Sequence, residues 1–301
     1  MQQDPIKKGA FLLPLIISLT LILQSELVLS QNREINEATV IMWHDGYYHA
    51  LIRLAMQKTS LEGSANIISL QYNTEFSRDK MTQKRMLSHL EKGEKLHIKA
   101  IGVTQERLDR FIPIRIPLLK GTLGIRVFLI HKDNQKAFSD IKSFADLQKN
   151  FVAGFGEQWS DIAILRANGL NVSGVAKPSL LPQMLSRKRY DFFPLEAQAA
   201  YSEEYLNYTN IQVEPNLALY YVYPRYFFIS KNQPKLADRV NRGLQLALED
   251  GSFDRLFFEY NAQLLIRSNL SNRKILKRLD NPNFPKSEEE PDISWLYSDW
   301  K

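Results

Sequence analysis

Short apolar stretches alternate with segments of helical pattern from residue 38 to about residue 260, and this alternation constrains the fold more than any other feature of the chain. The stretch "ATVIMW" at residues 38–43 has the composition of a strand, and the apolar residues after it recur at helical spacing. Residues 66–72 and 81–93 repeat this pair, and Gly93 is suited to end the second helix. Strands that alternate with helices predict an α/β fold with a mostly parallel sheet.

The middle of the chain interrupts this pattern. Residues 111–130, "FIPIRIPLLKGTLGIRVFLI", hold two prolines and two glycines among apolar residues, which indicates a crossing segment and not a core helix. A second set of strands and helices follows, up to the aromatic stretch at residues 217–230 and a long helix at residues 233–251. Because domains usually have roughly 100–200 residues, a chain of 301 residues with two such sets predicts two α/β lobes.

The charge of the chain favours anionic partners only weakly. Lys and Arg number 39 against 33 Asp and Glu, which gives a formal net charge of +6. The basic residues are spread along the chain, and none of the usual nucleic-acid-binding motifs is present. We therefore expect no nucleic-acid partner.

The N-terminus has the pattern of a secretory signal. Lys7 and Lys8 precede an apolar run at residues 10–23, which contains Pro14 and is shorter than the roughly 20 residues that span a bilayer. We expect residues 1–30 to be a cleavable signal peptide and the protein to be periplasmic; an uncleaved membrane anchor is the alternative. The chain has no cysteine, so disulfides, a lipid-modified cysteine and cysteine-based metal sites are excluded.

Residues 102–121, "GVTQERLDRFIPIRIPLLKG", carry a family resemblance. They resemble the T-x-E-R … F-s-x-P-Y region of type II periplasmic solute-binding proteins, extracellular solute-binding family 3, which includes the amino-acid-binding proteins of bacterial transporters. An aromatic loop after the first strand and "SFADLQ" before "FVAGFG" occur in the same order, so the resemblance covers about residues 38–260. The segments "RYDFFP" and "YFFISKN" are similar to a subgroup of uncharacterised ligand.

The resemblance implies a two-lobe periplasmic-binding-protein-like fold of type II, with two crossover strands and a ligand cleft between the lobes. On this interpretation residues 31–122 and 226–270 form lobe 1, and residues 123–225 form lobe 2. Residues 271–301 are expected to be an irregular C-terminal tail. Proteins of this type are usually monomers, and we expect a monomer here.

Arg107 is the first candidate for binding the carboxylate of an amino-acid-like ligand. It falls on the arginine of the family's motif, and a guanidinium offers a planar pair of donors that fits a carboxylate. The resemblance assigns the hydroxyl of Thr104 and the backbone of Gly102 to the same site. The alternative is a surface arginine at the start of a short helix that Thr104 caps.

Glu196 aligns best with the acidic residue that binds the ligand's ammonium group in the family. It follows "YDFFPL", where Pro194 is expected to interrupt the strand end, and it replaces the usual Asp. The alternative is that Glu196 stabilises the helix after it through the helix dipole.

The segment "GFGEQWSD" at residues 154–161 is a third candidate. Gly156 allows a sharp turn, Trp159 could line the ligand or pack between lobes, and Ser160 is predicted to cap a helix whose free N–H groups can bind an anion. The segment lacks both the third glycine of a dinucleotide site and the Gly-Lys-Ser/Thr of a phosphate loop. We therefore expect no nucleotide and no other cofactor.

The segment "WHDGYY" at residues 43–48 lies where the first strand should deliver an aromatic loop to the cleft. A ring there can stack on the ligand, so Trp43, Tyr47 and Tyr48 are candidates, with Tyr47 preferred, and Asp45 could bind a cation. The alternative is that Trp43 belongs to the core and His44 with Asp45 caps the helix. The five histidines show no metal-ligand spacing, so we expect no metal.

These features predict a protein that captures a small polar, amino-acid-like solute for an inner-membrane transporter or a membrane sensor. Closure around the ligand would then favour the state that the partner recognises. One alternative is an enzyme on the same fold, such as a dehydratase, with Glu196, His44 or Asp45 as acid or base. The other is a module that acts by protein contact, for which the aromatic tail at residues 272–301 is a candidate surface.

Overall fold

The computed structural model describes residues 40–42, 46–60, 70–72, 82–93 and 95–294. The chain divides into two compact units, and the first, residues 1–40 and 60–71, lies almost wholly outside this description. The strands β1 (Val40–Met42) and β2 (Leu70–Tyr72) form a two-stranded sheet. The account that follows concerns the second unit, residues 41–59 and 72–301.

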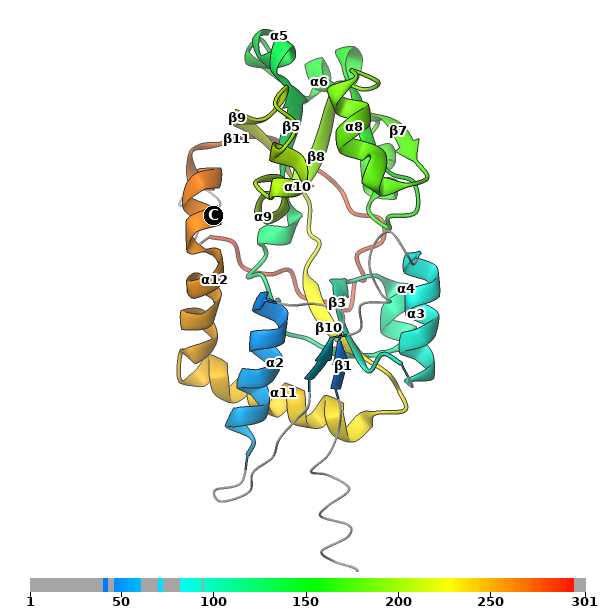
Figure 1. The fold of residues 1–301 in the computed structure, drawn as a ribbon, viewed down its shortest axis with the longest axis vertical. Helices are drawn as coiled ribbons and strands as arrows, with labels where there is room; N and C mark the ends of the chain where they lie inside the picture. Colours follow the sequence, from blue (N-terminus) through cyan, green and yellow to red (C-terminus); the bar gives the residue numbers. More distant parts are fainter. Residues whose placement is uncertain (1–39, 43–45, 61–69, 73–81, 94, 295–301) are drawn as a thin grey trace, which may run out of the picture. The chain divides into compact units, whose positions relative to one another are not determined.

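A three-stranded antiparallel sheet organises one half of this unit. Its order is β3–β10–β4, and β10 enters from the C-terminal part of the chain, with Arg225 opposite Gly102. The helix α11 packs against α2 and β4, and α12 packs against both α2 and α11 (Figure 1). The bounds are β3 Ile98–Gly102, β4 Ile112–Ile114, β10 Arg225–Ile229, α2 Gly46–Lys58, α3 Gln83–Lys92, α4 Gln105–Arg110, α11 Pro234–Glu249 and α12 Ser252–Ser268.

A six-stranded mixed sheet organises the other half, in the order β11–β9–β5–β8–β6–β7. Its strands are β5 Ile125–His131, β6 Val152–Gly156, β7 Asn171–Val175, β8 Phe192–Glu196, β9 Ile211–Tyr220 and β11 Lys274–Arg278. Its helices are α5 Gln135–Ser139, α6 Phe144–Asn150, α7 Ile162–Ala167, α8 Leu181–Ser186, α9 Ala197–Ala200 and α10 Glu203–Leu206. Short 3₁₀ turns occupy residues 122–124, 132–134, 178–180 and 270–272.

Local sequence signals set several of the helix ends. Thr82 caps α3, and Gly93 ends it in the left-handed region at φ 66°, as its position after the helical pattern predicts. Ser143 and Asp146 form a reciprocal capping box at the start of α6. These short-range bonds explain why the chain changes direction where it does.

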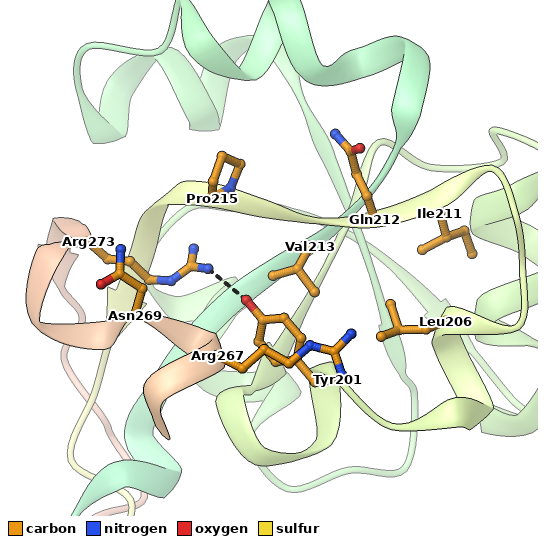
Figure 2. A pocket seen from close by; sticks show the side chains of 9 residues that line it. All are labelled: Tyr201, Leu206, Ile211, Gln212, Val213, Pro215, Arg267, Asn269 and Arg273. Atoms are coloured by element: carbon orange, nitrogen blue, oxygen red, sulfur yellow. Dashed lines mark hydrogen bonds between the residues drawn. The ribbon is translucent and has the colours of Figure 1, made fainter. Parts of the chain in front are cut away.

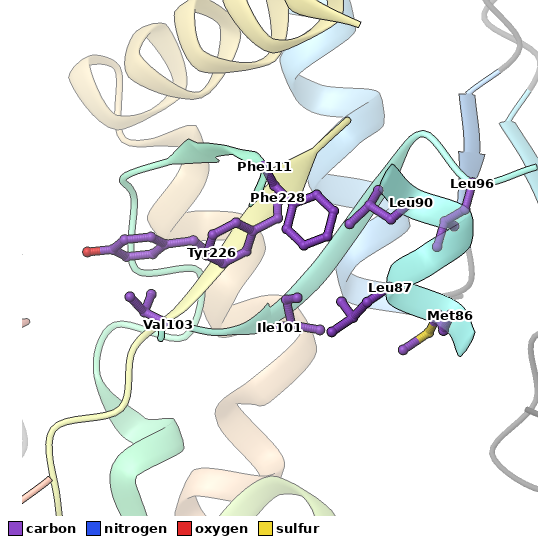
Figure 3. Packing of buried hydrophobic residues seen from close by; sticks show 9 residues of the cluster. All are labelled: Met86, Leu87, Leu90, Leu96, Ile101, Val103, Phe111, Tyr226 and Phe228. Carbon is purple, nitrogen blue, oxygen red and sulfur yellow. The ribbon is translucent and has the colours of Figure 1, made fainter. Parts of the chain in front are cut away.

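The core of the three-stranded half is a cluster of apolar side chains between α3 and the sheet (Figure 3). Phe228 and Leu90 are fully buried there, and Phe111 meets Phe228 edge to face at 6.3 Å between ring centroids. Burial of each such side chain contributes about 1.5–3 kcal/mol. The cluster fixes β3, and with it the start of α4, which carries the candidate site.

The prediction of a mostly parallel sheet is right only in part. The strands β6, β7 and β8 run parallel, but β5 is antiparallel to both of its neighbours, and the three-stranded sheet is wholly antiparallel. The reason is topological. The strands β5 and β10 each enter a sheet directly from the other half, without the crossover helix that makes consecutive strands parallel.

Two sequence interpretations are corrected by the strands. Pro194 does not interrupt β8, which continues to Glu196; β6 meets β8 at Ala153 and Phe192, ahead of the proline, so the missing N–H costs no bond to β6. The tail after residue 270 is not irregular throughout, because β11 pairs in parallel with β9. The sequence of this edge strand, "KILKR", is mostly charged and therefore did not indicate a strand.

Among the residues that the structure describes, no helix is both long enough and apolar enough to cross a membrane.

Candidate functional site

Arg107 lies at the centre of a cluster of polar groups. It sits in the first turn of α4 and is only 3 % exposed. One terminal nitrogen donates to the carbonyl oxygen of Gly102 at 2.6 Å and to the hydroxyl of Tyr223 at 3.3 Å. The other donates to the hydroxyl of Ser160 at 3.2 Å. Ser160 precedes α7 in the six-stranded half, so Arg107 joins the two halves.

The sequence around Arg107 explains its position. The hydroxyl of Thr104 accepts from the backbone N–H of Arg107 at 3.4 Å and begins α4, as the sequence predicts. Gly102 ends β3 with the ring of Tyr223 against it; a Cβ at Gly102 would lie 2.2 Å from that ring. The absence of a side chain at Gly102 therefore lets Tyr223 reach Arg107.

The hydroxyl of Ser160 bonds to Arg107 and Tyr223 and does not cap α7. Asp161 is the residue that precedes α7, and the predicted cap bond from Ser160 is not formed. The Ser160 hydroxyl instead meets the Tyr223 hydroxyl at 2.6 Å. The prediction that Ser160 caps this helix is wrong, because two side chains outside the helix compete for the same oxygen.

Asp161 belongs to an adjoining buried pair. Its carboxylate accepts from Arg126 at 2.8 Å and from the hydroxyl of Tyr221 at 2.9 Å. Burial works against the charge of Arg126, but Tyr221, Asp161 and Glu196 outweigh it and raise its pKa. Burial also raises the pKa of Tyr221 well above its ordinary value. Both groups therefore keep their ordinary charge states.

Glu196 is paired as well. It ends β8, and its side chain makes no capping hydrogen bond to α9. The alternative role, stabilisation of the helix after it, is therefore not supported by a capping bond. Arg225 donates to its carboxylate at 3.2 Å and to the hydroxyl of Tyr48 at 2.6 Å. Burial opposes the charge of Arg225, yet the neighbouring Glu196 and Tyr48 raise its pKa further. The guanidinium thus joins α2, β10 and β8.

The two aromatic candidates that the structure describes, Tyr47 and Tyr48, lie in different surroundings. Tyr48 lies beside Arg225, whose guanidinium carbon is 5.5 Å from the ring centroid. Tyr47 is buried against Phe257, and its hydroxyl donates to the carbonyl of Leu118 at 2.6 Å. The structure therefore places Tyr48, and not the preferred Tyr47, in the polar cluster. Trp43 and Asp45 lie outside the described residues.

Trp159 and Gly156 are neighbours. The Trp159 ring stacks on Phe193, with centroids 6.1 Å apart, and meets Phe155 edge on at 5.0 Å. A Cβ at Gly156 would lie 2.6 Å from the Trp159 ring. Trp159 is half-buried, and its ring packs against neighbouring rings beside Ser160.

Sequence reasoning missed Tyr223, Arg225, Arg126 and Asp161. Tyr223 and Arg225 both lie in "YYVYPR", within the aromatic stretch at residues 217–230. A single arginine among rings at a crossing is the signal that could have drawn attention to this segment. Within the described residues, no group of three or more His, Cys, Asp or Glu could hold a metal ion.

A cavity of about 450 Å³ lies elsewhere, between the end of α12 and β9 (Figure 2). Its buried arginine, Arg273, donates to backbone carbonyls of Ser268, Glu214 and Leu217 and to the hydroxyl of Tyr201. Arg267 lies over the Tyr201 ring, 5.0 Å from its centroid. Because Arg273 donates mainly to backbone carbonyls, whereas Arg107 donates mainly to side-chain hydroxyls, we assign this cavity to the packing of α12 and base the functional site on the Arg107 cluster.

Comparison with known proteins identifies the fold. No protein-family model matches the chain, and no curated protein matches it. Its structure is similar to an amino acid ABC transporter substrate-binding protein from Streptococcus pneumoniae bound to L-arginine, with 13% identity over 77% of this chain and 97% of that one and a TM-score of 0.54. A probable amino-acid ABC transporter extracellular-binding protein from Bacillus subtilis matches with 17% identity over 74% and 97% and a TM-score of 0.53.

An ancestral amino acid-binding protein, a precursor of cyclohexadienyl dehydratase, is similar to the same extent. It shows 17% identity, covers 77% of this chain and 99% of its own, and has a TM-score of 0.53. These similarities show that the chain has the two-lobe α/β fold of type II solute-binding proteins.

Proposed function

We propose that the protein is a periplasmic solute-binding protein that captures a small polar, amino-acid-like ligand between its two lobes. The observation that carries this proposal is the Arg107 cluster. Four predicted ligand-binding residues meet there: Gly102 and Thr104 at the start of α4, Arg107, and Ser160 from the other half. The guanidinium of Arg107 offers the paired N–H donors that bind a carboxylate in a bidentate way.

The ligand's carboxylate would take the place of the Ser160 and Tyr223 hydroxyls on Arg107. Both present partners are neutral, and bonds between ionised groups are about twice as strong as neutral ones. Among the described residues no carboxylate is paired with Arg107, so a ligand carboxylate meets no charged competitor there. The exchange therefore favours an anionic ligand group.

The ammonium group of such a ligand would bind to Glu196. This exchange costs more than the one at Arg107, because Arg225 already pairs with Glu196. A ligand with an additional hydrogen-bond acceptor for Arg225 would lower that cost. We infer that the side chain of the solute is polar.

We infer binding without chemical turnover. Asp161 and Glu196 are the carboxylates of the described cluster, and each is bonded to an arginine of its own chain, so neither stands ready as a general acid or base. Partner and location follow from the same proposal: a transporter or membrane sensor would recognise the loaded protein, which would be a periplasmic monomer released from its predicted signal peptide.

The test is calorimetric titration of the exported protein with the twenty amino acids, small carboxylates and polyamines, beside Arg107→Ala. Arg267→Ala is the matched control, since it removes an exposed arginine outside the cluster. We expect saturable binding of one ligand class to the wild type and to Arg267→Ala and none to Arg107→Ala. Binding that survives Arg107→Ala would contradict the assignment of the carboxylate site.

A second candidate is a module that acts by protein contact without a small ligand. The full engagement of the buried Arg107 by its own chain favours it. In this case no compound of the panel would bind the wild type, and Arg107→Ala would lower the melting temperature while Arg267→Ala would not.

A further inference from the structure

The C-terminal segment, residues 279–293, crosses between the two halves of the structure. It follows β11 and appears in red in Figure 1. We call it the C-terminal strap. Four of its side chains are buried despite the charged sequence "LDNPNFPKSEEEPDI": Leu279, Pro285, Glu288 and Ile293.

The first part of the strap is bonded to the six-stranded half and to the crossing strand. The N–H of Leu279 donates to the carbonyl of Tyr220 at 2.7 Å, and Asn281 donates to the carbonyl of Val222 at 2.7 Å. Asp280 and Asn168 exchange two bonds, of 2.8 and 3.0 Å. These contacts continue the pairing of β11 with β9 beyond the end of the sheet.

The last part of the strap is anchored on the three-stranded half. The buried carboxylate of Glu288 accepts from Arg115 at 2.9 Å, just after β4. Ile293 packs over Gly121, where a Cβ would lie 2.3 Å from the isoleucine side chain. Gly121 has φ 82°, a conformation that other residues adopt at a cost, so both backbone and space require glycine there.

Between these two anchors the strap passes the candidate site. The side-chain amide of Asn283 donates to the carbonyl of Ser160 at 3.4 Å, a long bond. The hydroxyl of the same serine contacts Arg107 and Tyr223. Any separation of Ser160 from Arg107 therefore pulls on the strap as well as on the two crossing strands.

We propose that the C-terminal strap is a third connection between the lobes, one that holds Ser160 against Arg107 and opposes opening of the cleft. Its effect on solute binding rests on the proposed function. A ligand carboxylate reaches Arg107 only when Ser160 and Tyr223 leave it, so a restraint on opening lowers the population of the binding-competent state. Apparent affinity falls in proportion to that population.

The test uses the absence of cysteine from the chain, which allows labels at two chosen positions. Lys84→Cys on α3 and Lys149→Cys on α6 are both exposed and lie in different halves. Spin labels on these cysteines report the distance between the halves by pulsed electron resonance without any solute. The strap is released by Glu288→Ala, alone and with Ile293→Ala, and Lys286→Ala is the matched control because it changes an exposed strap residue.

Glu288→Ala is chosen because it leaves no unpaired buried charge: Arg115, its partner, has a side chain that is 61% exposed. We expect the label distance to gain a second, longer population in Glu288→Ala, a larger one in the double variant, and no change in Lys286→Ala. An unchanged distance distribution in the folded double variant would overturn the proposal. If the double variant does not fold, Glu288→Ala alone decides between the two outcomes.

Solute affinity gives the second readout. For any amino acid that binds the wild type, release of the strap should tighten binding by up to about tenfold, a typical size for coupling between distant sites. Weaker binding would contradict the inferred direction. If no solute binds at all, the proposed function fails while the distance measurement still tests the strap.

Discussion

Two buried arginines of this protein differ in what surrounds them. Arg273 donates to three backbone carbonyls and to the hydroxyl of Tyr201, and the carboxylate of Glu214 lies 3.9 Å away. Arg107 donates to one carbonyl, and its other partners are the hydroxyls of Ser160 and Tyr223. Backbone carbonyls in a sheet cannot move away from a guanidinium, whereas hydroxyls on another element can. Burial alone therefore does not mark a ligand site; the mobility and charge of the partners do.

The largest effect is expected for Arg273→Ala. It would leave Glu214, which is fully buried, without its cation. Removal of one partner of a buried pair costs about 3–5 kcal/mol, so the free energy of unfolding in urea should fall by that amount. Arg267→Ala, in the same cavity but exposed, should change it by less than about 0.5 kcal/mol. Similar losses in the two variants would remove the structural role assigned to Arg273.

Arg107→Ala, in contrast to Arg273→Ala, should lower the stability of the protein only slightly and should mainly weaken solute binding. The hydroxyls of Ser160 and Tyr223 already bond to one another at 2.6 Å, so they keep a partner when the guanidinium is removed. We expect a loss of about 1 kcal/mol of stability. Binding of the solute should weaken by about 2–5 kcal/mol, as when one member of a desolvated charge pair is deleted. A large loss of stability with unchanged solute affinity would show that Arg107, like Arg273, has a structural role and does not bind the solute.

A pH titration sharpens the assignment of Arg273. Burial raises the pKa of Glu214 above 4.5, although the backbone N–H groups of Leu217 and Asn216 and the charge of Arg273 oppose the shift. An acid with a raised pKa in the folded state contributes stability below its unfolded pKa, and this contribution is lost as the pH rises through the folded pKa. The difference in stability between the wild type and Glu214→Gln should therefore shift against the wild type as the pH rises above about 4.5. A difference that does not vary with pH would show that burial leaves this carboxyl unperturbed.

The smallest effect is expected for Tyr223→Phe. It removes the bonds of 3.3 Å to Arg107 and 2.6 Å to Ser160 and keeps the ring against Gly102. One competing hydrogen bond of about 0.5–1.5 kcal/mol is lost from the unliganded site, so solute affinity should rise by roughly two- to tenfold. Calorimetry with the solute identified for the wild type checks this. A decrease in affinity would indicate that Tyr223 binds the solute itself.

The parts of this structure that the sequence predicts well are those governed by short-range contacts. Thr104 as the cap of α4 and Gly93 as the end of α3 depend on residues a few positions away. The grouping of Gly102, Thr104 and Arg107 follows from the same local turn. A single sequence contains all the information that such contacts need.

The remaining parts depend on long-range placement. Tyr223 and Arg225 reach the site only because β10 pairs with β3 in a register that sets Arg225 opposite Gly102. The strand β11 forms because β9 offers it an edge, not because its own residues favour a strand. The displacement of Ser160 from its expected capping role likewise comes from side chains 53 and 63 residues away along the chain. Patterns along the sequence do not encode these encounters.

The pairing of β3 with β10 also has a consequence for the order of folding. Because Gly102 of β3 pairs with Arg225 of β10, the three-stranded sheet cannot form until more than two thirds of the chain has been synthesised. The six-stranded sheet in turn gains its last strand only at Lys274–Arg278. Pairings of such long sequence separation slow folding, because loop closure must precede the contacts that reward it. The strand β3 of the newly made chain thus has to remain unaggregated without its partner strand, and chaperones that hold unfolded chains should have their strongest effect on this part.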